Sequence, residues 1–204
     1  QSYKYHYQGS MPIGPCCAVA DVTKDGARVF TNSQNMYGTR ASVKLALDTV
    51  LGSAALPLNR IRLTYYEGAS TYGPAAAWDD VAQAAAVMSS LAGKPVRLQL
   101  MRWDENGWSH YGPAQLTDVR GAVDASGNLV AFEYTQFGIP YFTTNHTQQQ
   151  VTGQAQFSTS GNVDTTISGS QYNVQNRKVI GKSLPLQDNY FKTTFLRAPV
   201  APQS

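Results

Sequence analysis

The stretch DDVAQAAAVMSSLAGKPVRLQLMR, residues 79–102, joins a helical pattern to a strand pattern and decides the fold class. Its first half begins with Asp79 and Asp80, acids that stabilise the first turn of a helix, and it ends at Gly93, a residue typical of a helix stop. Its second half alternates apolar and polar residues, as a strand with one buried face does. A helix followed directly by a strand indicates a layered domain that combines both.

The same succession of helix and strand extends on both sides of this stretch. Upstream, a short pattern typical of a strand ends at residues typical of a turn. The helix pattern that follows it ends before Gly52. Downstream, two strand patterns flank DASGN, where Asp, Gly and Asn supply a tight turn. We therefore predict an α+β fold, with a mixed sheet, two helices on one face and a strand hairpin. The predicted strands are residues 27–33, 61–67, 95–102, 116–123 and 129–137, and the predicted helices are residues 36–51 and 79–92.

Three segments differ in character along the chain. Residues 1–26 begin without a methionine and carry tyrosines at alternate positions, so we expect a strand segment that leads in from a larger subunit. Residues 27–140 hold the α+β domain. Residues 141–204 begin with a stretch rich in Thr, Gln, Ser and Gly, which predicts a polar and partly flexible excursion. Both ends of the chain read as cuts through a longer protein.

Composition argues against several function classes. The chain of 204 residues is 42% apolar, enough for a core, but only 14% of its residues are charged and its net charge is +3. That charge is too small for binding nucleic acid phosphates to be the main task, and few Lys and Arg residues surround the 12 tyrosines. No apolar stretch approaches membrane-spanning length. The adjacent Cys16 and Cys17 could form only a strained disulfide.

The turn GASTYGPAAAWDD, residues 68–80, has two interpretations. Taken locally, it is a plain connection between a strand and a helix, which is the commoner case. Its small residues and the helix start that follows would also let a ligand approach the backbone closely. Elsewhere the three histidines stand singly, without metal-ligand spacing. Trp103, Asp104, Glu105 and Trp108 form an acidic and aromatic cluster in MRWDENGWSHYGP, which we interpret as a capped turn beside the core with tryptophan as packing.

Six pieces of the chain, taken in order, resemble the molybdenum-cofactor subunit of the xanthine oxidase family of molybdenum hydroxylases. The similarity is closest to the branch of isoquinoline 1-oxidoreductases, nicotinate dehydrogenases and bacterial aldehyde dehydrogenases. The resemblance implies that residues 27–140 form a molybdenum cofactor-binding domain of mixed α+β type. The pieces are GSMPIGPCCAVADV, VFTNSQNMYGTRASVKLAL, LPLNRIRLTYYEGASTYG, DDVAQAAAVMSSLAGKPVRLQLMRWDENGW, YGPA and FLRAPVAPQS.

The resemblance implies roles for individual residues. Gln34 matches a glutamine beside the molybdenum centre, where a neutral amide can both donate and accept hydrogen bonds. The small residues of the 68–80 turn would leave room for the cofactor, and an arginine is apt for its oxygen-rich groups. The cofactor-binding residues implied are Gln34, Gly68, Tyr72, Gly73 and Arg197, and the substrate-binding residue implied is Lys178.

The chain also departs from the family pattern. Pro74, Ala75 and Ala76 stand where xanthine oxidases proper carry a glycine, a lysine and a substrate-facing glutamate, which argues against purine recognition. The catalytic base of the family is a glutamate near the end of the full subunit. We therefore expect no catalytic residue and no direct metal ligand in this chain, and no activity of the chain alone.

The implied function is that of an oxidoreductase that hydroxylates aldehydes or N-heterocycles with water and passes electrons to iron–sulfur clusters. The implied cofactor is the molybdenum–pterin cofactor, as molybdopterin cytosine dinucleotide. The implied partners are the rest of the large subunit, an iron–sulfur small subunit and the small-molecule substrate. A periplasmic location is expected, with the cytoplasm as the alternative. A different class of function stays open, namely a non-catalytic assembly or homodimerisation domain with exposed tyrosine-rich and alanine-rich faces.

Overall fold

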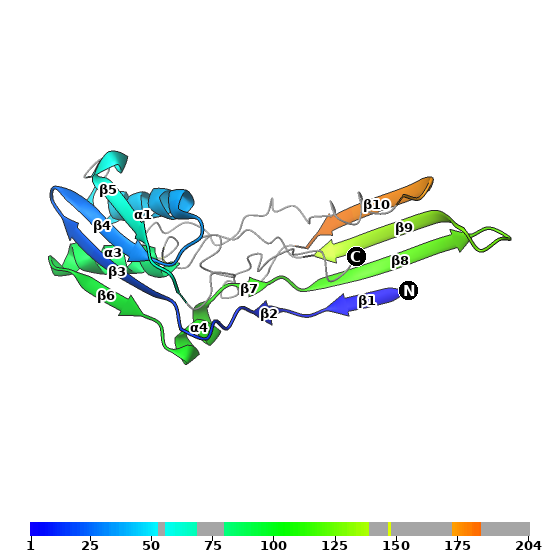
Figure 1. Ribbon diagram of the computed structural model, residues 1–204, viewed down its shortest axis with the longest axis horizontal. Helices are drawn as coiled ribbons and strands as arrows, with labels where there is room; N and C mark the ends of the chain where they lie inside the picture. The colour runs from blue at the N-terminus through cyan, green and yellow to red at the C-terminus, as the bar shows by residue number, and fades with distance from the viewer. Residues whose placement is uncertain (53–55, 69–79, 139–146, 148–172, 185–204) are drawn as a thin grey trace.

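The computed structural model describes residues 1–52, 56–68, 80–138, 147 and 173–184, and it places two sheets at opposite ends of an elongated molecule (Figure 1). In chain order the elements are β1 (Ser2–Tyr5), β2 (Gln8–Gly9), β3 (Cys17–Thr23), β4 (Gly26–Thr31), α1 (Met36–Leu51), η1 (Leu58–Arg60), β5 (Ile61–Tyr65), α3 (Asp80–Ala92), β6 (Val96–Gln99), α4 (Arg102–Trp108), β7 (Tyr111–Gly112), β8 (Gln115–Val123), β9 (Leu129–Gly138) and β10 (Asn176–Ser183). Of these, β2 and β7 pair with each other and connect the two ends.

The first sheet is mixed and has the strand order β5-β4-β3-β6. β4 and β5 run parallel, whereas β3 is antiparallel to both of its neighbours. α1 and α3 pack against each other and cover one face of this sheet. The predicted α+β fold, with two helices on one face of a mixed sheet, is confirmed.

The core lies between this sheet and the two helices. Burial alternates along β3 and β4, so every second side chain of each strand points toward the helices. Small residues let the layers approach closely, because α3 presents three alanines with no exposed surface to the sheet. The fully enclosed core residues include Ala20, Val29, Val43, Leu47, Ile61, Ala82, Ala85 and Ala86.

The second sheet has the strand order β1-β8-β9-β10. β8 and β9 form the predicted hairpin, whose turn holds Asp124 and Gly127, and Gly127 adopts a φ of 84° that favours glycine. β1 pairs antiparallel with the start of β8, and β10 pairs parallel with β9. The hairpin thus belongs to a sheet of its own rather than to the helix-covered sheet.

Two features differ from the sequence-based expectations. The predicted boundary between Gly26 and Ala27 falls inside β4. The strand before it, β3, is an inner strand of the first sheet, although the sequence assigned it to the leading segment. The stretch RWDENGW forms the helix α4 rather than a turn, started by a bond from Met101 N to Asp104 Oδ2 (2.9 Å). The expectation that Trp103 packs beside the core is wrong, since Trp103 is 69% exposed. In the described part of the chain, no helix is both long enough and apolar enough to cross a bilayer.

Candidate functional site

The edge at which β4 and β5 end carries the residues singled out in the sequence. Because the two strands are parallel, their carboxyl ends meet on the same side of the sheet, where open α/β sheets commonly bind ligands. A hydrogen bond from Tyr66 N to Thr31 O (2.9 Å) extends their pairing to this end. The segment that contains Gln34 follows β4, and Gly68 follows β5, so the structure brings both to one edge.

The segment between β4 and α1 holds Gln34 between two anchored residues. Ser33 is fully buried, and its hydroxyl lies 2.9 Å from the hydroxyl of Thr39 in α1. Asn35 caps α1, since its side-chain oxygen accepts a hydrogen bond from Gly38 N at 3.0 Å. Gln34 itself is exposed. Its backbone is therefore fixed on both sides while its amide faces outward from the edge.

Gly68 lies against the side chain of Asn32, the first residue after β4. A Cβ added at Gly68 would lie 2.5 Å from Asn32 Nδ2 and 2.9 Å from Asn32 Cβ. A glycine is therefore required here by the chain itself, independently of any ligand. The sequence reasoning passed over Asn32, although its position directly after a strand that ends at the binding edge of a sheet would have indicated it.

A cavity of about 440 Å³ opens beside this edge. Its volume lies within the usual range for small-molecule sites. One wall is aromatic, because the rings of Phe30 and Tyr66 meet edge to face with centroids 5.7 Å apart. The rest of the lining includes residues of β3 and of the segment directly before it. Among the residues that line the cavity are Pro15, Cys17, Phe30, Asn32, Tyr66 and Gly68.

A polar clasp fixes the segment that supplies the far wall of the cavity. Glu105 is 2% exposed and accepts hydrogen bonds from Cys16 N and from the Arg102 guanidinium, each at 2.9 Å. Arg102 also donates to the carbonyl oxygens of Pro12 (2.5 Å) and Ile13 (3.1 Å). Because these bonds join α4 to residues 12–16, the wall beside them is held in a defined position.

The remaining predicted site residues divide into two groups. Tyr72, Gly73 and Arg197 lie outside the described residues. Lys178 lies on β10 in the second sheet, where its ammonium group is 3.8 Å from Glu133 Oε1. The structure therefore does not bring Lys178 to the edge that holds Gln34 and Gly68 (Figure 1).

Direct protein ligands for a metal do not gather within the described ranges. No group of three or more His, Cys, Asp or Glu side chains is found there at a spacing that could hold an ion. Cys16 and Cys17 are not joined in a disulfide: Cys16 directly precedes β3 and is buried in the core, whereas Cys17 begins β3 and lines the cavity. What the edge offers a ligand is amide groups, backbone, an aromatic wall and the carboxylate of Glu67.

Comparison with known proteins gives a match over the whole length. The sequence model of the molybdopterin cofactor-binding domain matches residues 1–204. A nicotinate dehydrogenase subunit of Pseudomonas putida is 36% identical over 134 residues, which are 66% of this chain and 11% of the relative. The chain thus spans only a small part of the length of this curated relative.

Two solved structures share the fold. The aldehyde oxidoreductase from Desulfovibrio gigas superposes with a TM-score of 0.72 at 19% identity, covering 100% of this chain and 20% of that one. The quinoline 2-oxidoreductase from Pseudomonas putida 86 superposes with a TM-score of 0.74 at 15% identity, covering 97% of this chain and 23% of that one. At these identities the likeness concerns the fold.

Proposed function

We propose, since the chain belongs to the family of molybdopterin cofactor-binding domains, that the edge with Gln34 and Gly68 forms one wall of the cofactor pocket of a hydroxylating oxidoreductase. The family match confirms the resemblance to molybdenum hydroxylases that the sequence indicated. The substrate class that we propose is aldehydes or N-heterocycles. The similar proteins include a nicotinate dehydrogenase, an aldehyde oxidoreductase and a quinoline oxidoreductase, which supports this choice.

One observation carries the proposal: Gln34 and Gly68, far apart in sequence, come to the same edge of the first sheet, where Gly68 and Asn32 line a cavity of about 440 Å³. The residues present fit a pterin-type group, which is planar and rich in hydrogen-bonding atoms. The Asn32 amide in the cavity lining can donate and accept, and Phe30 and Tyr66 offer aromatic surface. Gln34 adds a second amide at the same edge, outside the lining of the cavity. The site therefore combines polar recognition with an apolar wall, as small-molecule sites usually do.

When bound, the molybdenum–pterin cofactor supplies the oxidation chemistry. This chain supplies positioning. Gln34 stands on backbone anchored by Ser33 and by the Asn35 cap, so the point from which its side chain extends is set before any ligand arrives. A preorganised neutral amide can stabilise charge without adding a net charge of its own. Asn32 covers Gly68 and sets the start of the connection that leads toward α3.

The direct test is the full-length subunit with Gln34→Ala, beside Gln8→Ala as a control. Gln8 is an exposed glutamine on β2, which pairs with β7 and is not part of the sheet whose edge carries Gln34. We expect kcat/KM for aldehydes and N-heterocycles to fall by at least tenfold in Gln34→Ala, a typical effect of removing one positioned donor. Molybdenum and pterin content per subunit gives a second readout. Unchanged turnover and unchanged cofactor content would show that the role of Gln34 is misassigned.

The finer parts of the proposal follow the resemblance. We propose molybdopterin cytosine dinucleotide as the form of the cofactor, an iron–sulfur small subunit as the electron acceptor and the periplasm as the location. Tyr72, Gly73 and Arg197 as cofactor contacts, and Lys178 as a substrate contact, stay predictions. Because one wall of a shared pocket binds weakly, we expect the isolated chain to contain neither molybdenum nor pterin and to be inactive. Elemental analysis and absorbance spectra of the purified chain check this.

A further inference from the structure

The face of the first sheet that points away from α1 and α3 is formed by a regular array of side chains. We call it the open face and define it by Asp21 and Val19 of β3, Arg28 and Phe30 of β4, Arg62 of β5 and Arg97 of β6. These residues alternate with the core residues of their strands, which places them together on the face opposite the helices. Val19 and Phe30 are half-buried, whereas the three arginines are exposed.

Two arginines lie side by side at one end of this face. Arg28 and Arg62 are register partners in the parallel pair of β4 and β5, so their Cα atoms are neighbours. Like charges in adjacent positions of a sheet destabilise it. Among the described residues, neither arginine forms an ion pair, and Asp21, the register partner of Arg28 on β3, does not come within ion-pair distance. Within the described ranges, no carboxylate neutralises the positive charge of this pair through an ion pair.

An apolar strip adjoins the arginines. Val19 and Phe30 are register partners in the next row of the sheet, and this row is bounded on β6 by Arg97, the partner of Val19. Val19 and Phe30 also line the cavity beside Gly68. Half-buried apolar groups ringed by arginine are typical of the centre and rim of protein–protein interfaces.

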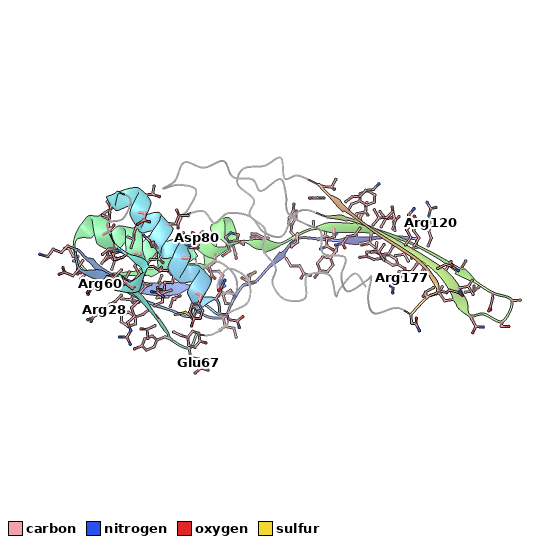
Figure 2. All side chains as sticks on the ribbon, turned by 90° about the horizontal axis from the view of Figure 1, so that it is seen from above. Arg28, Arg60, Glu67, Asp80, Arg120 and Arg177 are labelled. Atoms are coloured by element: carbon pink, nitrogen blue, oxygen red, sulfur yellow. The ribbon has the colours of Figure 1, made fainter. Side chains whose placement is uncertain are left out.

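A second copy of the chain is a poor occupant of this face. The chain has a net charge of +3, and a two-fold interface through the open face would bring each Arg28 and Arg62 pair toward its own copy. Figure 2 shows Arg28 on the end of the molecule that holds the first sheet, far from Arg120 and Arg177 at the other end. The positive charge of the open face is therefore separate from that of the second sheet.

We infer that the open face is a docking surface for another protein, whose contact segment carries carboxylates next to an apolar side chain. The carboxylates would bond to Arg28 and Arg62, whose planar guanidinium groups suit bidentate pairing. The apolar side chain would cover Val19 and Phe30. This inference goes beyond the cofactor pocket through Arg28 and Arg62, which do not line the cavity, whereas Val19 and Phe30 are shared with its lining. Loss of peptide binding in a variant of the two arginines therefore tests the docking surface apart from the pocket.

The probe for the test is the labelled peptide acetyl-Glu-Glu-Phe-Glu-Glu-amide, titrated with the chain and followed by fluorescence anisotropy. The matched peptide with glycine in place of phenylalanine tests the apolar strip. The variant Arg28→Glu/Arg62→Glu tests the arginine pair. The variant Lys4→Glu/Arg120→Glu makes the same change in net charge on residues of the second sheet.

We expect saturable binding that weakens by at least tenfold in Arg28→Glu/Arg62→Glu and by less than twofold in Lys4→Glu/Arg120→Glu. The glycine peptide should bind at least tenfold more weakly than the phenylalanine peptide. Equal losses in the two charge variants, absence of saturable binding, or displacement of the peptide by millimolar inorganic phosphate would each overturn the inference. Self-association of the unmodified chain through the open face, seen by sedimentation and abolished by Arg28→Glu/Arg62→Glu, would overturn it as well. Circular dichroism verifies that both variants are folded.

Discussion

The side chain of Asn32 lies directly over the α-carbon of Gly68, so that a Cβ at residue 68 would come within 2.5 Å of Asn32 Nδ2. Two strand ends that are 36 positions apart are thereby in van der Waals contact at the edge of the proposed pocket. The Asn32 side chain thus explains why residue 68 is a glycine. Any change there acts on Asn32 before it acts on a ligand.

Replacing Gly68 by alanine should therefore destabilise the chain. Since both Asn32 Nδ2 and Asn32 Cβ lie too close to the new methyl group, we expect a loss of roughly 1–3 kcal/mol in the free energy of unfolding, as for other overpacked sites. The matched control is Gly107→Ala in α4, where nothing lies within 4 Å of the added Cβ. That change should be neutral or stabilise the chain by up to about 1 kcal/mol. Urea denaturation measures both, and equal effects of the two changes would contradict the contact.

Replacing Asn35 by alanine should weaken the start of α1. The change removes the bond from Gly38 N to the Asn35 side chain and should cost about 1 kcal/mol. Asn35→Asp keeps an acceptor oxygen at the cap and should retain most of the stability. Thermal unfolding of both variants checks the expectation. An equal loss in the alanine and aspartate variants would show that the cap bond contributes nothing.

Replacing Glu105 by alanine should be the most damaging of the changes considered. The buried carboxylate joins Cys16 N to Arg102, and its removal takes away the acceptor of the Cys16–Glu105 bond and the carboxylate partner of Arg102 Nη1. We expect a loss of about 3 kcal/mol, as for other broken ion pairs that have a buried partner. Glu133→Ala, which breaks the exposed pair with Lys178, should cost less than about 1 kcal/mol. Similar losses for the two changes would show that the clasp is no stronger than a surface pair.

The turn of the β8–β9 hairpin should depend on pH. Hydrogen bonds from the side chain and backbone of Asn128, with smaller contributions from Ser126 and Gly127, hold the pKa of Asp124 below its ordinary value. Because the pKa of the folded state is depressed, the ionised carboxylate stabilises the turn above the ordinary pKa, and this support is lost as the pH falls through the depressed value. An NMR titration should show the Asp124 carboxyl and the Gly127 amide moving with one midpoint below the ordinary pKa. A midpoint at or above it would contradict these bonds.

The elements that the sequence predicts are those whose signals are local. Both long helices carry a pattern of apolar residues and a glycine stop, and the β8–β9 hairpin carries its turn residues, so each could be placed within a few positions. The pairing of β1 with β8 has no local signal, because partners more than a hundred positions apart are chosen by side-chain packing. The inclusion of β3 in the first sheet was missed for the same reason.

The candidate site was predictable in part. Gln34 and Gly68 could be named through a resemblance, since both lie in recognisable pieces of sequence. Asn32 could not be ranked above its polar neighbours, because its importance comes from a contact with Gly68 across two strands. Trp103 was misjudged, since large aromatic residues are usually buried and no residue near it signals exposure.

The pairing of the first strand with β8 has a consequence for synthesis on the ribosome. Ser2 bonds to Asp118, so the N-terminal strand must wait for a partner 116 positions downstream. At a translation rate of about 5–20 residues per second, that wait is roughly 6 to 24 seconds. During this interval a nascent strand with Tyr3 and Tyr5 has an unsatisfied backbone edge. A newborn chain with this topology thus cannot pair β1 until the strand β8 has left the exit tunnel.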